Sequence, residues 1–193
     1  MEFGIRFLEP HSELLQRCHF YDDQGVLLLV GECGAPWQEA EDSKIRITTP
    51  GGDLLATLDF PGVESTGKQG QGRIGYALIH DHAVYAIITK HTPKDPDGEE
   101  TLPYFTVEVE GERWLVLGER GNGRSQVSTF VLCANAPTNL AVYADLMDAC
   151  DETLGKIRRV VGDYDYDITF PENRFQQPHL ISLALTFLIH QIP

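Results

Sequence analysis

Residues 178–192 (PHLISLALTFLIHQI) constrain the fold of this chain more than any other segment. A helix over these residues has no broad polar face, because apolar side chains occur at Leu180, Ile181, Leu183, Ala184, Leu185, Phe187, Leu188, Ile189 and Ile192. A helix that is hydrophobic all round must be buried in protein or in a membrane. Its strongly apolar part is shorter than the roughly 20 residues that a bilayer requires. We therefore predict a helix buried in the protein and no transmembrane span.

The residues before this helix alternate short apolar segments with turn signals, which is typical of β-strands. Turns are expected at residues 22–25, where Gly25 can adopt a positive φ, at residues 50–53, and at His80-Asp81-His82. Strands are predicted at residues 26–30, 44–48, 54–60, 74–79, 83–90, 104–109, 114–117, 127–133, 141–144, 156–161 and 164–170. Residues 139–150 also suit a short helix.

Many short strands at regular spacing predict a mainly β fold, either an antiparallel barrel or a sandwich. An apolar helix that follows such strands indicates a plug enclosed by the sheet. The 193 residues are enough to bury a core, and no change of composition divides them. We therefore expect a single domain over residues 1–193.

The charge balance restricts the partners. The chain has 29 acidic and 15 basic residues and a net charge of −14. Such a field repels phosphate backbones and anionic lipid headgroups. Nucleic acid is therefore not expected as a partner, and acidic membranes are disfavoured unless a local patch or a cation reverses the sign.

The four cysteines, Cys18, Cys33, Cys133 and Cys150, have no CxxC spacing and are too sparse for a disulfide framework. The first residues (MEFGIRFLEPHSELLQ) lack the basic and apolar regions of a secretory signal. Both features predict reduced, partly buried thiols in a cytoplasmic protein.

One histidine cluster has ligand types that suit zinc: His80, Asp81 and His82, with His91 nearby in sequence. Four defined ligands are the norm for zinc, and no second clear pair accompanies His80 and His82. We therefore expect a turn with polar residues, and a metal-dependent hydrolase on a β-barrel remains an alternative.

Other motifs of catalysis are weak. The glycine-rich segments 67–72 (GKQGQG) and 118–123 (GERGNG) do not follow a strand and open a helix, as a phosphate-binding loop does. Ser125 and Ser128 lie near no nucleophile-elbow motif. No catalytic, metal or cofactor-binding residue is assigned, and we expect no enzyme.

Residues 162–191 (GDYDYDITFPENRFQQPHLISLALTFLIHQ) resemble the C-terminal signature of phospholipid scramblases and LURP-one-related proteins. That signature has an acidic stretch, a strand ending in Phe-Pro (here Phe170-Pro171), a short polar linker and a final apolar helix. Residues 153–160 (TLGKIRRV), 104–119 (YFTVEVEGERWLVLGE) and 19–32 (HFYDDQGVLLLVGE) are similar to other hairpins and strands of these families. The resemblance covers nearly the whole chain, and its C-terminal third is the most specific part.

These families belong to the tubby-like superfamily. The resemblance implies a closed, mainly antiparallel β-barrel of about twelve strands around a hydrophobic C-terminal helix. It implies a lipid-associated or regulatory binding or scaffold domain, with lipid or protein as the ligand and without an agreed active site. Fold alone does not confer function, so this is an analogy.

Two departures from the relatives concern the ligand. Tubby proteins bind phosphoinositide headgroups through basic residues, and the best basic cluster here is Lys156, Arg158 and Arg159. In a strand Lys156 and Arg158 share one face and Arg159 points to the other. We expect ordinary solvated charges there. Scramblases also carry cysteine clusters for lipidation and a proline-rich N-terminal tail, which are absent from this sequence.

Scramblases place acidic residues on both sides of the Phe-Pro for calcium. Here Asp163, Asp165 and Asp167 alternate before it, which predicts three carboxylates on one strand face. Calcium takes six to eight oxygen ligands, and after Phe170-Pro171 only Glu172 is acidic. We therefore expect a solvated acidic face. A calcium-dependent, membrane-associated scramblase-like protein remains the first alternative function.

Overall fold

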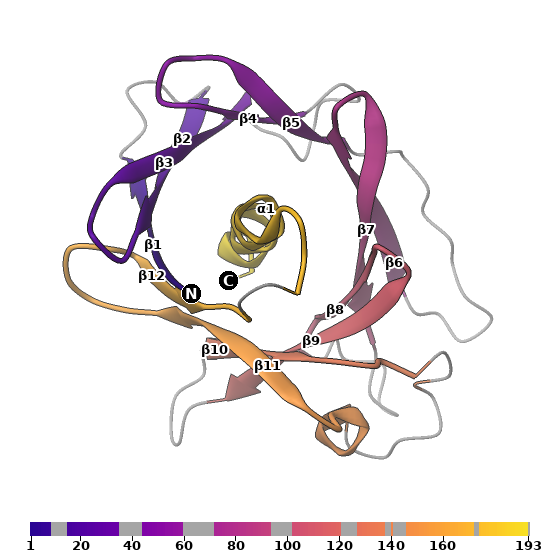
Figure 1. The fold of residues 1–193 in the computed structure, drawn as a ribbon. Coiled ribbons are helices and arrows are strands. Elements are labelled where there is room, and N and C mark those ends of the chain that lie inside the picture. Colours follow the sequence, from indigo (N-terminus) through magenta and orange to yellow (C-terminus); the bar gives the residue numbers. More distant parts are fainter. Residues whose placement is uncertain are drawn as a thin grey trace.

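The structure is a computed structural model that describes residues 1–8, 15–34, 44–59, 72–93, 102–120, 127–137, 140, 146–171 and 174–192. Twelve strands form one closed antiparallel barrel, and an α-helix lies inside the ring (Figure 1). Each strand pairs with its neighbours in sequence, and β1 closes the ring against β12. The predicted closed antiparallel barrel of about twelve strands with a C-terminal helix is confirmed. This architecture is compatible with the tubby-like fold.

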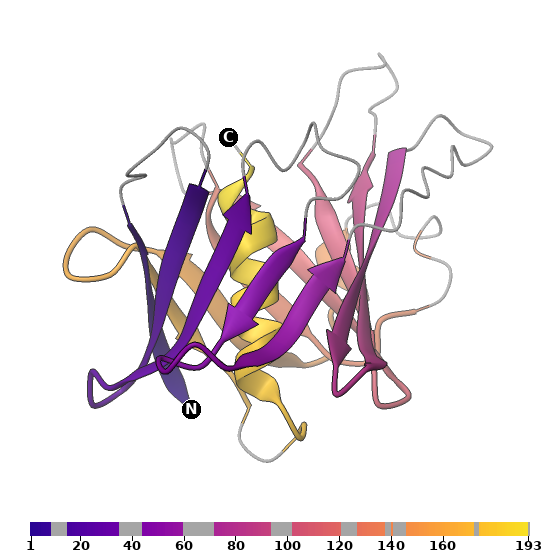
Figure 2. The ribbon, with the colours of Figure 1, turned by 90° about the horizontal axis from the view of Figure 1, so that it is seen from above.

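The strands are β1 (Glu2–Leu8), β2 (Leu15–Asp22), β3 (Leu27–Gly34), β4 (Ile45–Thr48), β5 (Leu54–Asp59), β6 (Gly72–His80), β7 (Ala83–Thr92), β8 (Tyr104–Val109), β9 (Glu112–Arg120), β10 (Val127–Cys133), β11 (Thr153–Arg159) and β12 (Tyr166–Thr169). A 3-10 helix, η2 (Leu146–Ala149), precedes β11, and α1 (Pro178–His190) follows β12. Because consecutive strands are antiparallel, the β2–β3, β4–β5, β6–β7 and β8–β9 turns all lie at one end of the barrel. The N-terminus lies at the same end, and the C-terminus at the other (Figure 2).

The predicted strands differ from the observed ones mainly at the N-terminus. No strand was expected over residues 2–8, yet Phe3 and Ile5 alternate inward along β1 and are buried. The predicted strand at residues 141–144 lies outside the described residues, and η2 occupies the end of the segment for which a short helix was the alternative. The predicted residues 160–161 are not in β11, which ends at Arg159.

Helix α1 is a plug for the barrel. Eight strands leave an interior that side chains alone can fill, so twelve strands enclose a wider space. A helix about 10 Å across occupies it, and eleven residues of α1 are buried. Its polar Ser182 and Thr186 donate hydrogen bonds to the carbonyls of Pro178 and Ser182, so neither hydroxyl needs a partner in the wall.

One glycine of the barrel wall leaves room for a side chain of α1. A Cβ at Gly31 of β3 would lie 2.7 Å from the Phe187 ring and 2.9 Å from Cys18 Sγ. Real Cβ atoms do not approach other atoms so closely, so the side chain of Phe187 requires glycine at this position of the wall.

A second apolar cluster lies on the outer face of β8–β10. The cluster contains Tyr104, Leu115, Leu117, Val131, Cys133, Ala136 and Ala149, and the partly buried Leu140, Leu146 and Cys150 pack against it. These covering residues belong to the connection from β10 to β11, so the wall is two layers thick here.

A disulfide fastens this cover to the wall. Cys133, at the end of β10, is bonded to Cys150, with 5.2 Å between their Cα atoms. The prediction of four reduced thiols is therefore wrong for this pair, because the β10–β11 connection folds back and brings residues 17 apart in sequence together. Cys18 and Cys33 are free and buried, as predicted.

Candidate functional site

The four short turns at one end of the barrel concentrate acidic and exposed apolar residues. We call residues 22–27, 49–54, 80–84 and 109–112 the hairpin rim. The rim contains six carboxylates and neither lysine nor arginine: the acidic residues are Asp22, Asp23, Asp53, Asp81, Glu110 and Glu112. Three rim side chains are large, apolar and more than half exposed, namely Val26 (56%), Leu54 (53%) and Val84 (59%).

Local turn chemistry sets the direction of these side chains. Asp22 Oδ1 accepts hydrogen bonds from the backbone N–H groups of Gln24 (3.0 Å) and Val26 (2.8 Å), and Gly25 takes the predicted positive φ, 74°. In the β6–β7 turn Asp81 and His82 both have positive φ, 49° and 62°. A two-residue turn with positive φ at both positions matches the twist of a hairpin. The turns are thus closed tightly, and their apolar residues point to solvent.

A groove of about 350 Å³ lies between the β6–β7 and β8–β9 turns. Its apolar lining includes Val84 and Ile87, and Ile87 is 44% exposed. Glu108, Glu110 and Arg113 also line it. Arg113 Nε lies 3.7 Å from Glu108 Oε1, so the arginine that lines the groove forms an ion pair within it.

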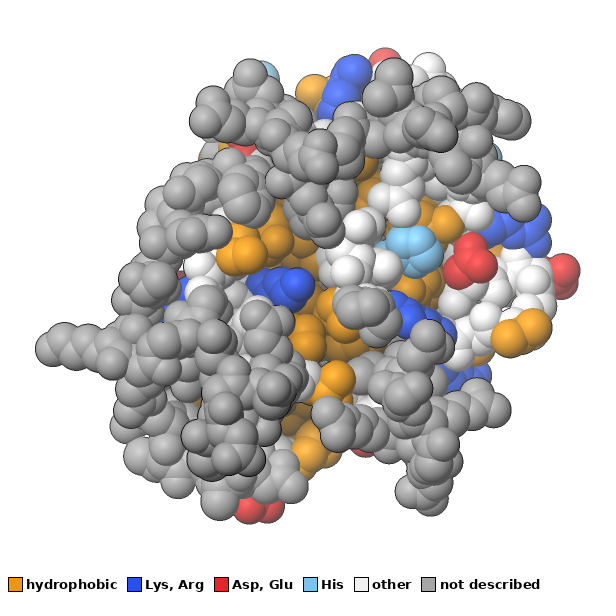
Figure 3. All heavy atoms as spheres, turned by 180° about the vertical axis from the view of Figure 1, so that it is seen from behind, with side chains coloured by type: hydrophobic (Ala, Val, Ile, Leu, Met, Phe, Trp, Pro, Cys, Tyr) orange, Lys and Arg blue, Asp and Glu red, His pale blue; other side chains and the backbone are white. Residues whose placement is uncertain are grey.

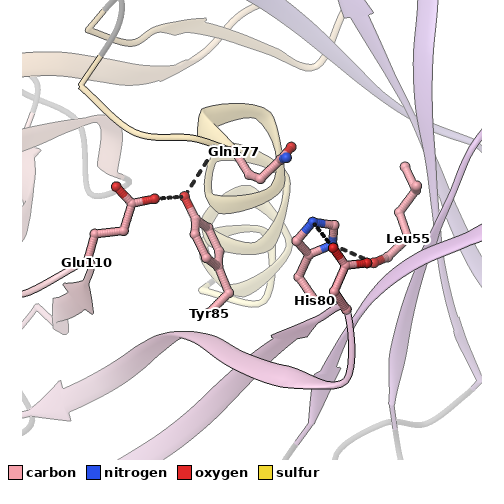
Figure 4. Close-up of polar contacts among 6 residues, drawn as sticks. Leu55, His80, Tyr85, Glu110 and Gln177 are labelled. Atoms are coloured by element: carbon pink, nitrogen blue, oxygen red, sulfur yellow. Dashed lines mark hydrogen bonds and ion pairs between the residues drawn. The ribbon is translucent and has the colours of Figure 1, made fainter.

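One side of this groove is tied to the entry of α1 into the barrel (Figure 4). Tyr85 donates its hydroxyl proton to Glu110 Oε1 over 2.9 Å, and the backbone N–H of Gln177 donates to the Tyr85 hydroxyl over 3.0 Å. The N–H of Gln176 donates to the same Glu110 oxygen over 3.2 Å. Burial is the main cause that raises the pKa of Tyr85 to about 12, so the phenol stays a donor at neutral pH.

Glu112 binds Arg174, which lies just before α1 in the chain. One oxygen, Oε2, accepts from Trp114 Nε1 and from Arg174 Nε, each over 3.1 Å. The bond from Trp114 and the neighbouring Arg174 guanidinium lower the pKa of Glu112. Arg174 also lies 3.7 Å from Glu152. Together with Tyr85, the β8–β9 turn therefore holds residues 174–177 by hydrogen bonds and fixes where α1 begins. We call these contacts the latch.

The histidines considered for a metal do not converge. His80 Nδ1 is 2.8 Å from the carbonyl oxygen of Leu55 (Figure 4). Its Nε2 is 3.4 Å from Asp81 Oδ2. His91 lies near the far end of β7, about 25–30 Å along the strand from the turn at 3.3 Å per residue. Asp81 and His82 form the expected turn.

His91 has a different environment, on the outer face of β7. It is buried, stacks on Tyr104 with ring centroids 4.5 Å apart, and has Nε2 3.0 Å from Thr106 Oγ1. Burial, with Arg73 and Arg113 nearby, lowers its pKa to about 4. Its Nδ1 has no hydrogen-bond partner among the described residues.

The three aspartates considered for calcium do not share a strand face. Strand β12 begins at Tyr166, so Asp163 and Asp165 precede it and only Asp167 is in the strand. Asp163 lies beside Arg6, which donates to its backbone carbonyl, and Asp165 Oδ2 accepts the backbone N–H of Phe7 over 2.6 Å. Asp167 Oδ2 is 3.1 Å from Arg158 Nη2. The prediction of one carboxylate face is therefore wrong, because the turn separates the three groups.

The basic cluster is divided as the strand pattern predicts. Lys156 and Arg158 are exposed on the outer face of β11. Arg158 and Asp167 both line a second groove of about 290 Å³, where they pair. Asp167 thus offsets the positive charge that a phosphoinositide would need there, and Arg158 offsets the negative charge that a calcium ion would need.

Arg159 points into the barrel and caps the last turn of α1. Its Nη2 donates to the carbonyl oxygens of Ile192 (2.7 Å) and Ile189 (3.3 Å), and its Nε donates to the Tyr166 hydroxyl. His190 Nδ1 is 3.1 Å from the same hydroxyl, and its ring stacks on Phe7. Burial and Arg159 lower the pKa of His190. At this end, hydrophobic side chains are visible near the centre of the face (Figure 3).

Sequence reasoning missed the latch and the rim. Tyr85, Glu110 and Arg174 come from three separate segments, and no spacing rule joins them. A signal for the rim was present, since all four turns lack lysine and arginine in the sequence.

The comparisons with known proteins give no family. No protein-family model matches the chain, and neither the curated proteins nor the solved structures contain a match. Among the described residues, no group of three or more His, Cys, Asp or Glu side chains is placed to hold a metal ion. The same part of the chain contains no helix with the length and apolarity to cross a membrane.

Proposed function

We propose that this protein is a non-enzymatic, tubby-like binding or scaffold domain over residues 1–193, whose ligand is another protein bound at the outer surface of the barrel. The observation that carries this proposal is the occupied lumen. Helix α1 fills the interior, and both described grooves lie on the outside. A ligand therefore meets the turns and outer strand faces.

The scramblase-like alternative requires α1 to leave the barrel and insert in a bilayer. Seven large apolar side chains of α1 are buried, and each contributes about 1.5–3 kcal/mol on burial. Exposing them to water would cost roughly 10–20 kcal/mol. A bilayer would bury the helix again, but the inward apolar side chains of the strands would lose their contacts with α1. The latch at Glu110 and Glu112 and the cap at Arg159 add to this cost. These contacts support a helix that stays inside.

The hydrolase alternative has less support. His80 and His91 are far apart, and the Nδ1 of His80 is engaged by a backbone carbonyl. Tyr85 and Glu110 form a hydrogen-bonded pair, but both hold the residues before α1. We assign them a structural role.

Two measurements on the full chain test the proposal. Flotation with neutral and with phosphoinositide-containing vesicles, each with and without calcium, is expected to leave the protein unbound. Crosslinking in cells followed by mass spectrometry is expected to recover a partner protein joined to the outer surface. Calcium-dependent flotation, or the absence of any crosslinked protein, would contradict a protein-binding domain.

A further inference from the structure

The hairpin rim combines features that fit one kind of ligand. Its three exposed apolar residues, Val26, Leu54 and Val84, lie on three successive turns. Exposed large apolar side chains that gather on one surface with a polar border are typical of interaction sites. Ile87, 44% exposed, extends this surface into the groove beside the β6–β7 turn.

The charge of the rim determines the chemistry of the partner. Asp23, Asp53 and Asp81 are exposed beside the three apolar residues, and the rim has no lysine or arginine. Surfaces in specific interfaces have complementary potentials, which steer encounter and exclude wrong partners. The rim therefore favours a cationic ligand, and it repels anionic lipids and nucleic acid.

The spacing of the turns describes the shape of that ligand. Neighbouring strands lie about 4.8 Å apart, and successive turns are two strands apart, so their tips are separated by about 10–12 Å around a tilted barrel. Two turns of an α-helix advance about 10.8 Å. The turns follow the curve of the ring and not one line, so apolar side chains two turns apart on a helix are spaced to reach neighbouring turns, such as those of Val26 and Leu54 or of Leu54 and Val84.

We propose that the hairpin rim docks a basic amphipathic helix of a partner protein, with apolar side chains on Val26, Leu54 and Val84 and lysine or arginine side chains on Asp23, Asp53 and Asp81. This inference rests on the proposed protein-binding function and specifies its site and the chemistry of its partner.

Three synthetic peptides of about four helical turns serve as probes: lysine–leucine with a leucine stripe, glutamate–leucine with the same stripe, and lysine–serine with the same charge. Each is titrated into the isotopically labelled full chain and followed by amide NMR shifts. The lysine–leucine peptide is expected to bind, with shifts on the rim and along the groove. The lysine–serine peptide is expected to bind at least about tenfold more weakly, and the glutamate–leucine peptide not at all.

Variants separate the rim from general attraction to an acidic protein. V26S/L54S/V84S removes the apolar anchors, and D23N/D53N/D81N removes the charges; both change exposed positions and should leave the fold intact, which the NMR spectrum checks. The matched control, V161S/D163N, alters an exposed apolar residue and an exposed carboxylate at the other end of the barrel. Each rim variant is expected to weaken lysine–leucine binding at least about tenfold, and the control to leave it unchanged.

The inference is overturned if the lysine–leucine peptide causes no shift at ~1 mM, or if it binds the rim variants as well as the unaltered chain. Flotation with anionic vesicles that depends on the same rim residues would also overturn it, in favour of a membrane ligand. If crosslinking recovers a partner that is retained by both rim variants, the binding-domain proposal stands and the rim inference alone fails.

Discussion

At the residue scale, two neighbouring arginines of β11 have opposite roles. Arg159 is turned inward and donates to two carbonyl oxygens at the end of α1, whereas Arg158 pairs with Asp167 on the outer surface. Removing a charged donor from partly buried carbonyls costs more than removing an exposed ion pair. We expect Arg159→Met to lower the free energy of unfolding by about 1–2 kcal/mol, and Arg158→Met to change it by less than about 0.5 kcal/mol. Urea denaturation of both variants measures this; equal effects would contradict an inward cap.

Two glycines of β3 provide a second matched pair. A Cβ at Gly31 would meet the Phe187 ring, whereas a Cβ at Gly34 would have no atom of the described residues within 4 Å. We predict that Gly31→Ala lowers the free energy of unfolding by about 1–3 kcal/mol through overpacking, and that Gly34→Ala is close to neutral. Thermal or urea unfolding distinguishes the two. A neutral Gly31→Ala would mean that α1 does not press against this part of the wall.

The buried His91 predicts a pH dependence. Its pKa is lowered from 6.5 to about 4 in the folded protein, so between these values the unfolded chain binds a proton that the folded chain does not. Stability is therefore complete above pH 6.5 and falls as the pH decreases toward 4, by up to about 3 kcal/mol from this group.

Urea denaturation between these pH values, repeated with His91→Gln, measures how much His91 contributes to the loss of stability. The variant is expected to have a flatter slope, although the lowered pKa values of His19, His179 and His190 leave part of it in place. His82→Gln, in the exposed β6–β7 turn, is the control. An unchanged slope in His91→Gln would show that His91 accepts a proton in the folded state.

At the element scale, the connection from β10 to β11 depends on its disulfide. The Cys133–Cys150 bond closes a loop with a sequence separation of 17 over the outer apolar cluster. A closed loop of this length is worth about 3 kcal/mol in a chain-entropy model. Cys150→Ser is therefore expected to lower the free energy of unfolding by about that amount, and a reductant is expected to lower it in the unaltered chain but not in the variant.

A thiol count checks the same bond directly. Protein denatured without reductant should contain two reactive thiols, from Cys18 and Cys33. Four reactive thiols would mean that all cysteines are reduced, as the sequence predicted, and would contradict the Cys133–Cys150 disulfide.

Individual elements show what the sequence could and could not predict. The lack of a polar face over residues 178–192 predicted the buried helix, and the alternation of apolar and polar residues predicted most strands. Both signals are local in the sequence. The Cys133–Cys150 bond depends on the return of a long connection, and Cys spacing does not encode that path. The aspartate prediction failed for a similar reason: alternation at Asp163, Asp165 and Asp167 implies one face only if the strand continues, and β12 begins at Tyr166.

At the scale of the whole molecule, the barrel and α1 form one structure whose two ends differ. Glu110, Glu112 and Tyr85 hold the beginning of α1, and Arg159, Tyr166 and His190 hold its last turn. The end with the short turns carries the acidic, apolar rim, which we propose as the docking site because α1 fills the interior.

Hydrogen exchange of the full chain tests this account most directly. The amides of residues 183–187, at the centre of α1, are expected to exchange as slowly as those of the barrel strands, through global unfolding. Neutral or phosphoinositide-containing vesicles with calcium are expected to leave that rate unchanged. If α1 exchanges much faster than the strands, or becomes exposed when vesicles and calcium are added, the helix is a releasable element and the account of a fixed plug is wrong.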